Sequence, residues 1–181
     1  MKRRDFLKNI GVAGLATFLA SSPWISALSE SEHTQKEKIR LAIIGAGSRA
    51  RHLSRFLTQN PRVEIAVLCD IYQPSIDSTL KLVPGAKVCM DYRKVLDDKS
   101  IDAVVIATPL NSHYPIAMDA FDAGKHVFCE KTIGFTLEEC FNMYQKHRQT
   151  GLIFFTGQQR LFDPRYLKAM EMIHSGTFGE I

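Results

Sequence analysis

The segment from Ile39 to Ala50, with the sequence IRLAIIGAGSRA, decides the fold of this chain. Its first half, Ile39–Ile44, is an apolar run that predicts a buried strand. The run leads directly into the pattern G-x-G-x-x-A, in which Gly45 permits a tight turn and Ala50 allows the following helix to pack closely on the strand. Gly47 lets a pyrophosphate approach the backbone, and the free N–H groups and dipole of the helix start favour its charge. The segment therefore predicts a dinucleotide-binding turn.

An acidic residue follows the second predicted strand. Asp70 comes directly after Val63–Cys69 and lies 25 residues after Gly45. A carboxylate at this position accepts hydrogen bonds from ribose hydroxyls and repels a 2′-phosphate. The next three residues, 71–73, include no arginine or lysine. The sequence therefore favours NAD over NADP, although it leaves NADP open.

Apolar runs and helical stretches alternate after residue 38, which is typical of an α/β domain with a doubly wound parallel sheet. The length of 181 residues suits one such domain well and two poorly. A composition of 45% hydrophobic and 23% charged residues excludes a disordered or collagen-like chain. The predicted strands are Ile39–Ile44, Val63–Cys69, Lys87–Met90, Ile101–Ala107, His126–Cys129 and Ile153–Thr156. The predicted helices are Ala50–Gln59, Pro74–Leu82, Tyr92–Asp97, Tyr114–Ala123, Leu137–Gln149 and Arg165–His174.

Polar residues follow the last three predicted strands. They are residues 108–113 after the fourth strand, 130–132 after the fifth and 157–160 after the sixth. Each also has an explanation that involves no ligand: Thr108-Pro109 ends a strand, His113 faces water, Glu130-Lys131 is a solvated pair, and Arg160 is a surface charge. Ligands of open α/β sheets bind at the carboxyl ends of the strands, so the shared location favours a site.

The first 29 residues are typical of an export signal. A basic head precedes an apolar stretch, Ile10–Ala20, and the head resembles the twin-arginine motif in its Arg3-Arg4-x-Phe6-Leu7-Lys8 pattern. A membrane anchor is the alternative, but the apolar stretch is much shorter than the roughly 20 residues that a spanning helix needs. We expect a protein exported to the periplasm, with membrane contact during export alone and a polar linker at residues 30–37.

The net charge of +4 comes mainly from this segment, which holds four of the 23 basic and one of the 19 acidic residues. The remaining 19 basic and 18 acidic residues form no basic run, so a nucleic-acid partner is not expected. The four cysteines, at positions 69, 89, 129 and 140, lack C-x-x-C spacing. We therefore expect no metal site and no disulfide.

The residues after position 39 resemble the Gfo/Idh/MocA oxidoreductases, which include glucose–fructose oxidoreductase and inositol dehydrogenase. The resemblance runs to Ile181. It is carried, in order, by Gly45-x-Gly47, Cys69-Asp70, Ala107-Thr108-Pro109-x-x-x-His113, Gly124-Lys125-His126-Val127-x-x-Glu130-Lys131, Arg160 and Ser175-Gly176-x-Phe178-Gly179-Glu180. It implies a Rossmann domain at residues 38–160, then a connecting helix and the start of an α/β substrate domain at 161–181, with the rest of that domain missing from this chain. The family usually has proline after the Glu-Lys pair, where this chain has Thr132.

The resemblance also implies roles for individual residues. Those facing the cofactor pyrophosphate and adenosine ribose would be Gly45, Gly47, Ser48, Arg49 and Asp70. Those at the nicotinamide half would be Thr108, Pro109, Asn111 and His113, with Glu130 near its ribose. Lys131 would have the catalytic role, because its positive charge reaches the oxygen on the reacting carbon and stabilises the alkoxide-like charge that develops as hydride leaves.

The resulting hypothesis is hydride transfer between a nicotinamide cofactor and a sugar, polyol or related carbonyl compound, in a homo-oligomer when the protein is complete. A histidine or aspartate of the second domain would move the proton. Two alternatives stay open. Some exported relatives use tightly held NAD to cleave glycosides, although they generally replace the lysine of the Glu-Lys pair. The other alternative is a fragment that binds nucleotide without catalysis.

Overall fold

The computed structural model describes residues 38–179. The expected export signal and linker, residues 1–37, lie outside the described residues. The strands are β1 (Ile39–Ile44), β2 (Val63–Cys69), β3 (Lys87–Cys89), β4 (Ala103–Ile106), β5 (His126–Cys129) and β6 (Phe154–Thr156). The helices are α4 (Ser48–Leu57), α5 (Gln73–Leu80), α6 (Tyr92–Asp97), α7 (His113–Asp122), α8 (Leu137–Thr150) and α9 (Pro164–His174), with short 3₁₀ turns η1 (Leu110–Ser112) and η2 (Gln159–Phe162).

The six strands form one sheet in the order β3-β2-β1-β4-β5-β6, and every neighbouring pair is parallel. This confirms the predicted doubly wound α/β fold. The strand order reverses between β1 and β4, so the connections after these two strands leave in opposite directions and open a crevice. Ile44 is in register with both Cys69 and Ile106, and Ile106 is in register with Cys129. The loops that follow these strands therefore begin side by side at one edge of the sheet.

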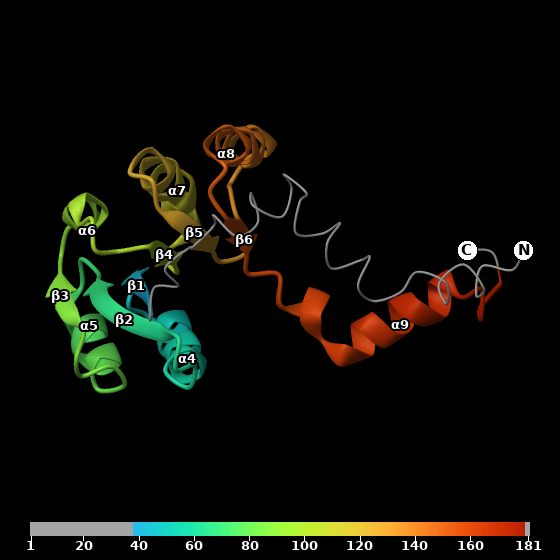
Figure 1. Ribbon diagram of the computed structural model, residues 1–181, viewed down its shortest axis with the longest axis horizontal. Coiled ribbons are helices and arrows are strands. Elements are labelled where there is room, and N and C mark those ends of the chain that lie inside the picture. The colour runs from blue at the N-terminus through green and yellow to red at the C-terminus, as the bar shows by residue number, and fades with distance from the viewer. Residues whose placement is uncertain (1–37, 180–181) are drawn as a thin grey trace, which may run out of the picture. The chain divides into compact units, whose positions relative to one another are not determined.

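Helices cover both faces of the sheet. Figure 1 shows α4 and α5 on one side of the strands and α6, α7 and α8 on the other. The first side buries Ala50 of α4 against β1 and β2, and the second buries Phe121 of α7 and Met143 of α8. Successive strand residues point to opposite faces, and β1 is buried on both because Leu41 and Ile43 join one cluster while Ala42 and Ile44 join the other.

Part of the sheet on the α4 side is an open apolar groove of about 320 Å³, lined by residues such as Leu53, Phe128 and Phe155. Helix α9, beyond β6, has no buried residue. Among the described residues, no helix combines the length and apolar character that crossing a membrane requires.

Candidate nucleotide-binding site

The turn after β1 requires glycine at its first position. Gly45 has a φ of +91° and its N–H donates to the carbonyl oxygen of Cys69 at 2.7 Å. A Cβ atom at Gly45 would lie 2.6–2.7 Å from backbone atoms of Ala107 and Thr108. Gly45 therefore lets the turn after β1 sit directly against the end of β4. At Gly47, in contrast, a Cβ atom would meet no protein atom within 4 Å, which leaves space for a ligand to approach.

The start of α4 is open to an anion. Gly47 is its N-cap and supplies no side-chain bond to the first free N–H groups, and the first turn holds no acidic residue. Ser48 is exposed and Arg49 is partly exposed. Uncapped N–H groups at the positive end of a helix dipole stabilise a phosphate.

Asp70 supports the glycine turn as well as facing the cleft. Its Oδ2 accepts a hydrogen bond from the N–H of Ala46 at 2.7 Å, and its Oδ1 accepts one from the N–H of Tyr72 at 2.9 Å. Each carboxylate oxygen can accept more than one hydrogen bond, so both retain capacity for ribose hydroxyls.

These groups open onto a cleft of about 950 Å³ at the carboxyl edge of the sheet. Eight of the predicted site residues line it: Gly45, Gly47, Ser48, Arg49, Asp70, Thr108, Pro109 and Asn111. The Oγ1 of Thr108 is buried and makes no hydrogen bond within the described part of the chain, so it is available to a bound molecule. The cleft is large enough for a cofactor and its polar groups are concentrated where phosphate and ribose would lie.

Glu130 lies outside the lining of this cleft but is joined to it through Arg49. The Nε and Nη2 atoms of Arg49 both contact Oε1 of Glu130 at 2.6 Å, although the two residues are 81 positions apart. The carboxylate also accepts a hydrogen bond from the N–H of Lys131 at 3.2 Å. A Cβ atom at Gly157 would lie 2.9 Å from this carboxylate, so a glycine after β6 makes room for it.

Lys131 is exposed at the end of β5, and the peptide bond between Lys131 and Thr132 is cis. His113 is placed differently from a cofactor-facing residue. It is 2% exposed and does not line the cleft. Its two ring nitrogens contact backbone carbonyl oxygens, Nδ1 that of Thr132 at 2.7 Å and Nε2 that of Thr108 at 2.9 Å.

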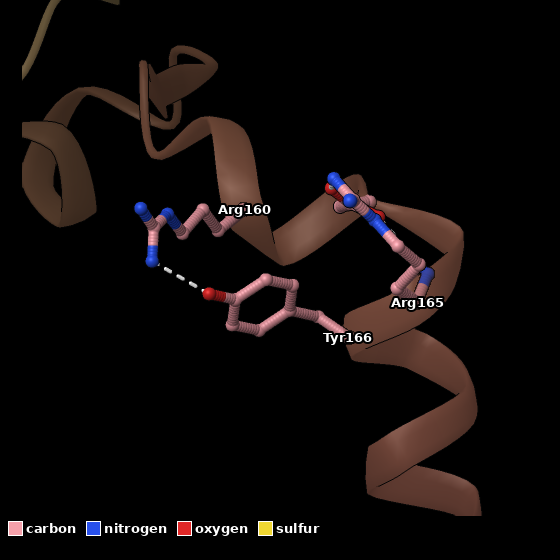
Figure 2. Close-up of polar contacts among 4 residues, drawn as sticks. Arg160, Arg165 and Tyr166 are labelled. Atoms are coloured by element: carbon pink, nitrogen blue, oxygen red, sulfur yellow. Dashed lines mark hydrogen bonds and ion pairs between the residues drawn. The ribbon is translucent and has the colours of Figure 1, made fainter.

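Arg160 lies in η2, after β6, and its side chain contacts a residue of the following helix α9. Its Nη1 donates to the hydroxyl of Tyr166 at 2.6 Å, and Figure 2 shows the two side chains pointing toward each other. Asp163 caps α9 by accepting from the N–H of Arg165 and pairs with its guanidinium. Arg160 therefore links η2 to α9.

The structure also brings together residues that the sequence patterns did not single out. Met90, which directly follows β3, and Tyr92 and Arg93 of α6 form a wall of the cleft beyond Asp70. Burial, together with a hydrogen bond to Asp119, raises the pKa of the Tyr92 hydroxyl. The strand order of a doubly wound sheet could have indicated this wall, because β3 lies next to β2 and the residues after β3 therefore lie beside Asp70. Within residues 38–179, no group of three or more histidine, cysteine or acidic side chains is arranged to hold a metal ion.

Comparison with known proteins agrees with this geometry. Residues 39–158 match the Gfo/Idh/MocA model, described as an oxidoreductase family with an NAD-binding Rossmann fold. The scyllo-inositol dehydrogenase of Lactobacillus casei, solved with NAD(H) and scyllo-inositol, is 29% identical with a TM-score of 0.73 over 80% of this chain and 43% of its own. An NAD-binding protein from Listeria innocua is 31% identical with a TM-score of 0.71, over 80% of this chain and 42% of its own.

Among the curated proteins, a glycosyl hydrolase family 109 protein from Parabacteroides distasonis is 32% identical over 99% of this chain and 42% of its own length. One from Stenotrophomonas maltophilia is 29% identical over 100% of this chain and 40% of its own. The chain thus spans about two fifths of the length of these relatives.

The sheet order, the glycine turn and the cleft define an NAD-binding Rossmann domain. The match to the family covers residues 39–158, well over half of the sequence. The chain belongs to the Gfo/Idh/MocA oxidoreductase family.

Proposed function

We propose that this protein transfers a hydride between NAD and a sugar, polyol or related carbonyl compound. The observation that carries the proposal is the position of Lys131, next to a buried carboxylate that is tied to the glycine loop through Arg49. The solved relative that holds scyllo-inositol supports a polyol as the class of substrate.

The residues of the cleft fit NAD. The uncapped start of α4 and the open space at Gly47 suit the pyrophosphate, and Asp70 suits the adenosine ribose. The unpartnered hydroxyl of Thr108 is a further polar group for the cofactor. When bound, the nicotinamide ring accepts or returns a hydride.

Lys131 supplies charge to the reacting oxygen in this proposal. As hydride leaves the carbon of an alcohol, its oxygen loses a proton and gains carbonyl character, and an ammonium beside it stabilises the intermediate negative charge. Glu130, which accepts from the Lys131 N–H and pairs with Arg49, fixes the backbone from which the lysine extends. The proton goes to a histidine or aspartate outside residues 38–179, as the family resemblance implies.

Glycoside cleavage through transient oxidation is the second candidate. It is favoured by relatives named glycosyl hydrolase family 109 that match nearly the whole of this chain, and by one from Shewanella oneidensis named alpha-N-acetylgalactosaminidase, which is 29% identical over 99% of this chain and 44% of its own length. Both candidates oxidise a sugar carbon with bound NAD, and they differ in whether hydride returns to the same molecule. Lys131 favours the dehydrogenase, since glycoside-cleaving relatives generally replace that lysine.

Two assays of the complete protein separate these candidates. With NAD and a panel of inositols and simple sugars, a dehydrogenase accumulates NADH, which is measured by absorbance. With a chromogenic α-N-acetylgalactosaminide, a glycosidase releases the chromophore without net NADH. Lys131→Ala should lower the dehydrogenase rate by about 100-fold. The matched control is Lys99→Ala, an exposed lysine before β4 at the opposite edge of the sheet. NAD binding without turnover in either assay would contradict the proposal and indicate a nucleotide-binding module.

We also propose that residues 1–29 direct export by the twin-arginine route. That route carries folded proteins with their cofactor, which suits a protein that needs NAD in a compartment without free nucleotide. Fusion of residues 1–37 to a reporter that folds before export tests this. Replacement of Arg3 and Arg4 by lysine should keep the reporter inside the cell, and periplasmic reporter from that variant would contradict the proposal.

A further inference from the structure

His113 uses both of its ring nitrogens inside the protein. It is the first residue of α7, it is 2% exposed, and its imidazole lies between the carbonyl oxygens of Thr108 and Thr132. Both contacts, at 2.9 and 2.7 Å, are within ordinary hydrogen-bond distance. The ring is therefore engaged with backbone rather than with a ligand.

The two carbonyls belong to the two loops that flank the nicotinamide half in the proposed function. Thr108 follows β4 and lines the cleft, while Thr132 directly follows Lys131 after β5. The strands themselves stay connected as far as the N–H of Glu130, which donates to the carbonyl of Ile106. His113 continues this connection past the end of the sheet.

The chemistry of the contacts requires an N–H donor on the ring, because both partners are carbonyl oxygens. A carbonyl oxygen only accepts, and a neutral imidazole carries a single N–H. The tautomer decides which nitrogen carries that N–H, and the ring lies between the two oxygens at 2.7 and 2.9 Å. The ring thus contacts both loops, and an N–H on either nitrogen hydrogen-bonds to one of them.

We propose that His113 is a positioning residue whose ring, between the carbonyl oxygens of Thr108 and Thr132, ties the two loops together and thereby holds the backbone of Lys131 in place. The link to Thr108 orders a wall of the NAD cleft, and the link to Thr132 orders the lysine loop. The effect on turnover rests on the proposed function, whereas the ordering of the two loops does not.

Asparagine and glutamine separate the two links. The amide nitrogen of asparagine is as many bonds from Cβ as Nδ1 of histidine, and that of glutamine as many as Nε2. His113→Asn should thus place a donor at the Thr132 carbonyl and none at the Thr108 carbonyl. His113→Gln should do the reverse. His113→Leu fills the space without any donor, and His52→Gln, at an exposed position on α4, is the matched control.

Hydrogen exchange of the whole chain reads out the loops without any substrate. In His113→Gln, exchange should rise by about threefold to tenfold at residues 131–136 and stay unchanged at 108–112, as expected for one lost hydrogen bond. His113→Asn should show the opposite pattern, and His113→Leu should show both. Titration with NAD should give weaker binding for Asn and Leu and near wild-type binding for Gln.

Turnover of the complete protein is a second measurement that distinguishes the two links. We expect His113→Gln to lower kcat with little change in the KM for NAD, and His113→Asn to raise that KM with little change in kcat. Absence of turnover in wild type would contradict the proposed function alone, because exchange and NAD binding would still test the links.

Equal effects of Asn and Gln on the two loops, or wild-type exchange in His113→Leu, would overturn the positioning role. A measurement on the wild-type chain covers the case in which the variants fail to fold. NMR of the His113 ring should show an N–H proton that exchanges slowly with solvent, as expected for a buried imidazole between two carbonyl oxygens. A ring N–H that exchanges as fast as that of the exposed His52 would also overturn the proposal.

Discussion

At the scale of single residues, Gly45 and Gly47 have different roles in the same turn. Gly45 has a positive φ and lies against the backbone of Ala107 and Thr108, directly after β4, so the folded chain itself needs glycine there. Gly47 has a φ of −73° and nothing within 4 Å of its missing side chain. The protein alone gives no reason for glycine at this position, and a ligand does. The same sequence motif thus contains one structural and one ligand-directed glycine.

Alanine substitutions should therefore separate stability from binding. We expect Gly45→Ala to lower the free energy of unfolding by about 2–5 kcal/mol, because it combines backbone strain with a clash that the backbone of Ala107 cannot relieve. Gly47→Ala should leave stability within about 0.5 kcal/mol and weaken NAD binding at least about tenfold. Denaturant unfolding and NAD titration measure the two effects. Equal loss of stability in both variants would show that the turn is one rigid unit.

A third glycine should act on the site through a side chain. In Gly157→Ala the new methyl group meets the Glu130 carboxylate, which is flexible enough to move but loses its place beside Arg49. We expect slower turnover in the complete protein, with a stability loss of about 1–3 kcal/mol. Gly85→Ala is the matched control, since a Cβ there meets no atom within 4 Å. Wild-type turnover in Gly157→Ala would mean that the pair between Arg49 and Glu130 is dispensable.

At the scale of elements, the start of α8 fixes the end of the loop that carries Lys131. Thr136 accepts a hydrogen bond from the N–H of Glu139 at 3.1 Å, and the Glu139 carboxylate accepts from the N–H groups of Phe135 and Thr136. This capping box satisfies N–H groups that the first turn of a helix leaves free. The loop from β5 to α8 is therefore held at both ends.

Removal of the cap should loosen the first turn of α8. Thr136→Ala should cost about 1 kcal/mol of stability and raise hydrogen exchange at residues 136–140, while Thr136→Ser keeps the accepting oxygen and should behave like wild type. Chemical denaturation and exchange measurements check this. If Ser and Ala are equally destabilised, the methyl group of Thr136 rather than its hydroxyl stabilises the helix start.

The elements were largely predictable from sequence, and the contacts between them were not. Apolar runs bounded by glycine and proline located all six strands, although β4 is shorter at both ends than the predicted Ile101–Ala107. Helix α4 begins at Ser48 rather than Ala50 because Gly47 is already its N-cap. The turns η1 and η2 carry no periodic signal that would predict them. The pairing of Arg49 with Glu130 and the burial of His113 depend on strand order and loop packing, which no local pattern encodes.

At the scale of the whole molecule, the interior contains thiols that resist ionisation. Burial, with the neighbouring Cys89 and Asp70 as lesser causes, raises the pKa of Cys69 to about 12. Burial, with Glu130 as a lesser cause, raises that of Cys129 to about 12. Both residues immediately precede the acidic residues of the site. The folded protein therefore keeps these thiols neutral at pH values where the unfolded chain would ionise them.

This difference predicts alkaline destabilisation. The folded pKa of both thiols exceeds the unfolded value of 9.0, so the folded state holds more protons between about pH 9 and 12. The stability they contribute is complete below pH 9 and is lost as pH rises through this window. Unfolding free energies across the window should fall more steeply for wild type than for the Cys69→Ala, Cys129→Ala double variant. Parallel curves would show that other groups account for the pH dependence.

The central position of β1 has a consequence for synthesis. The strand is made first among those described, yet one of its edges pairs with β2 and the other with β4, whose last residue is Ile106. As the chain leaves the ribosome, β1 to β3 can assemble while the second edge of β1 still lacks its neighbour, and an unpaired edge readily recruits other strands. Nascent chains in which β3 has left the ribosome and β4 has not should therefore depend most on chaperones.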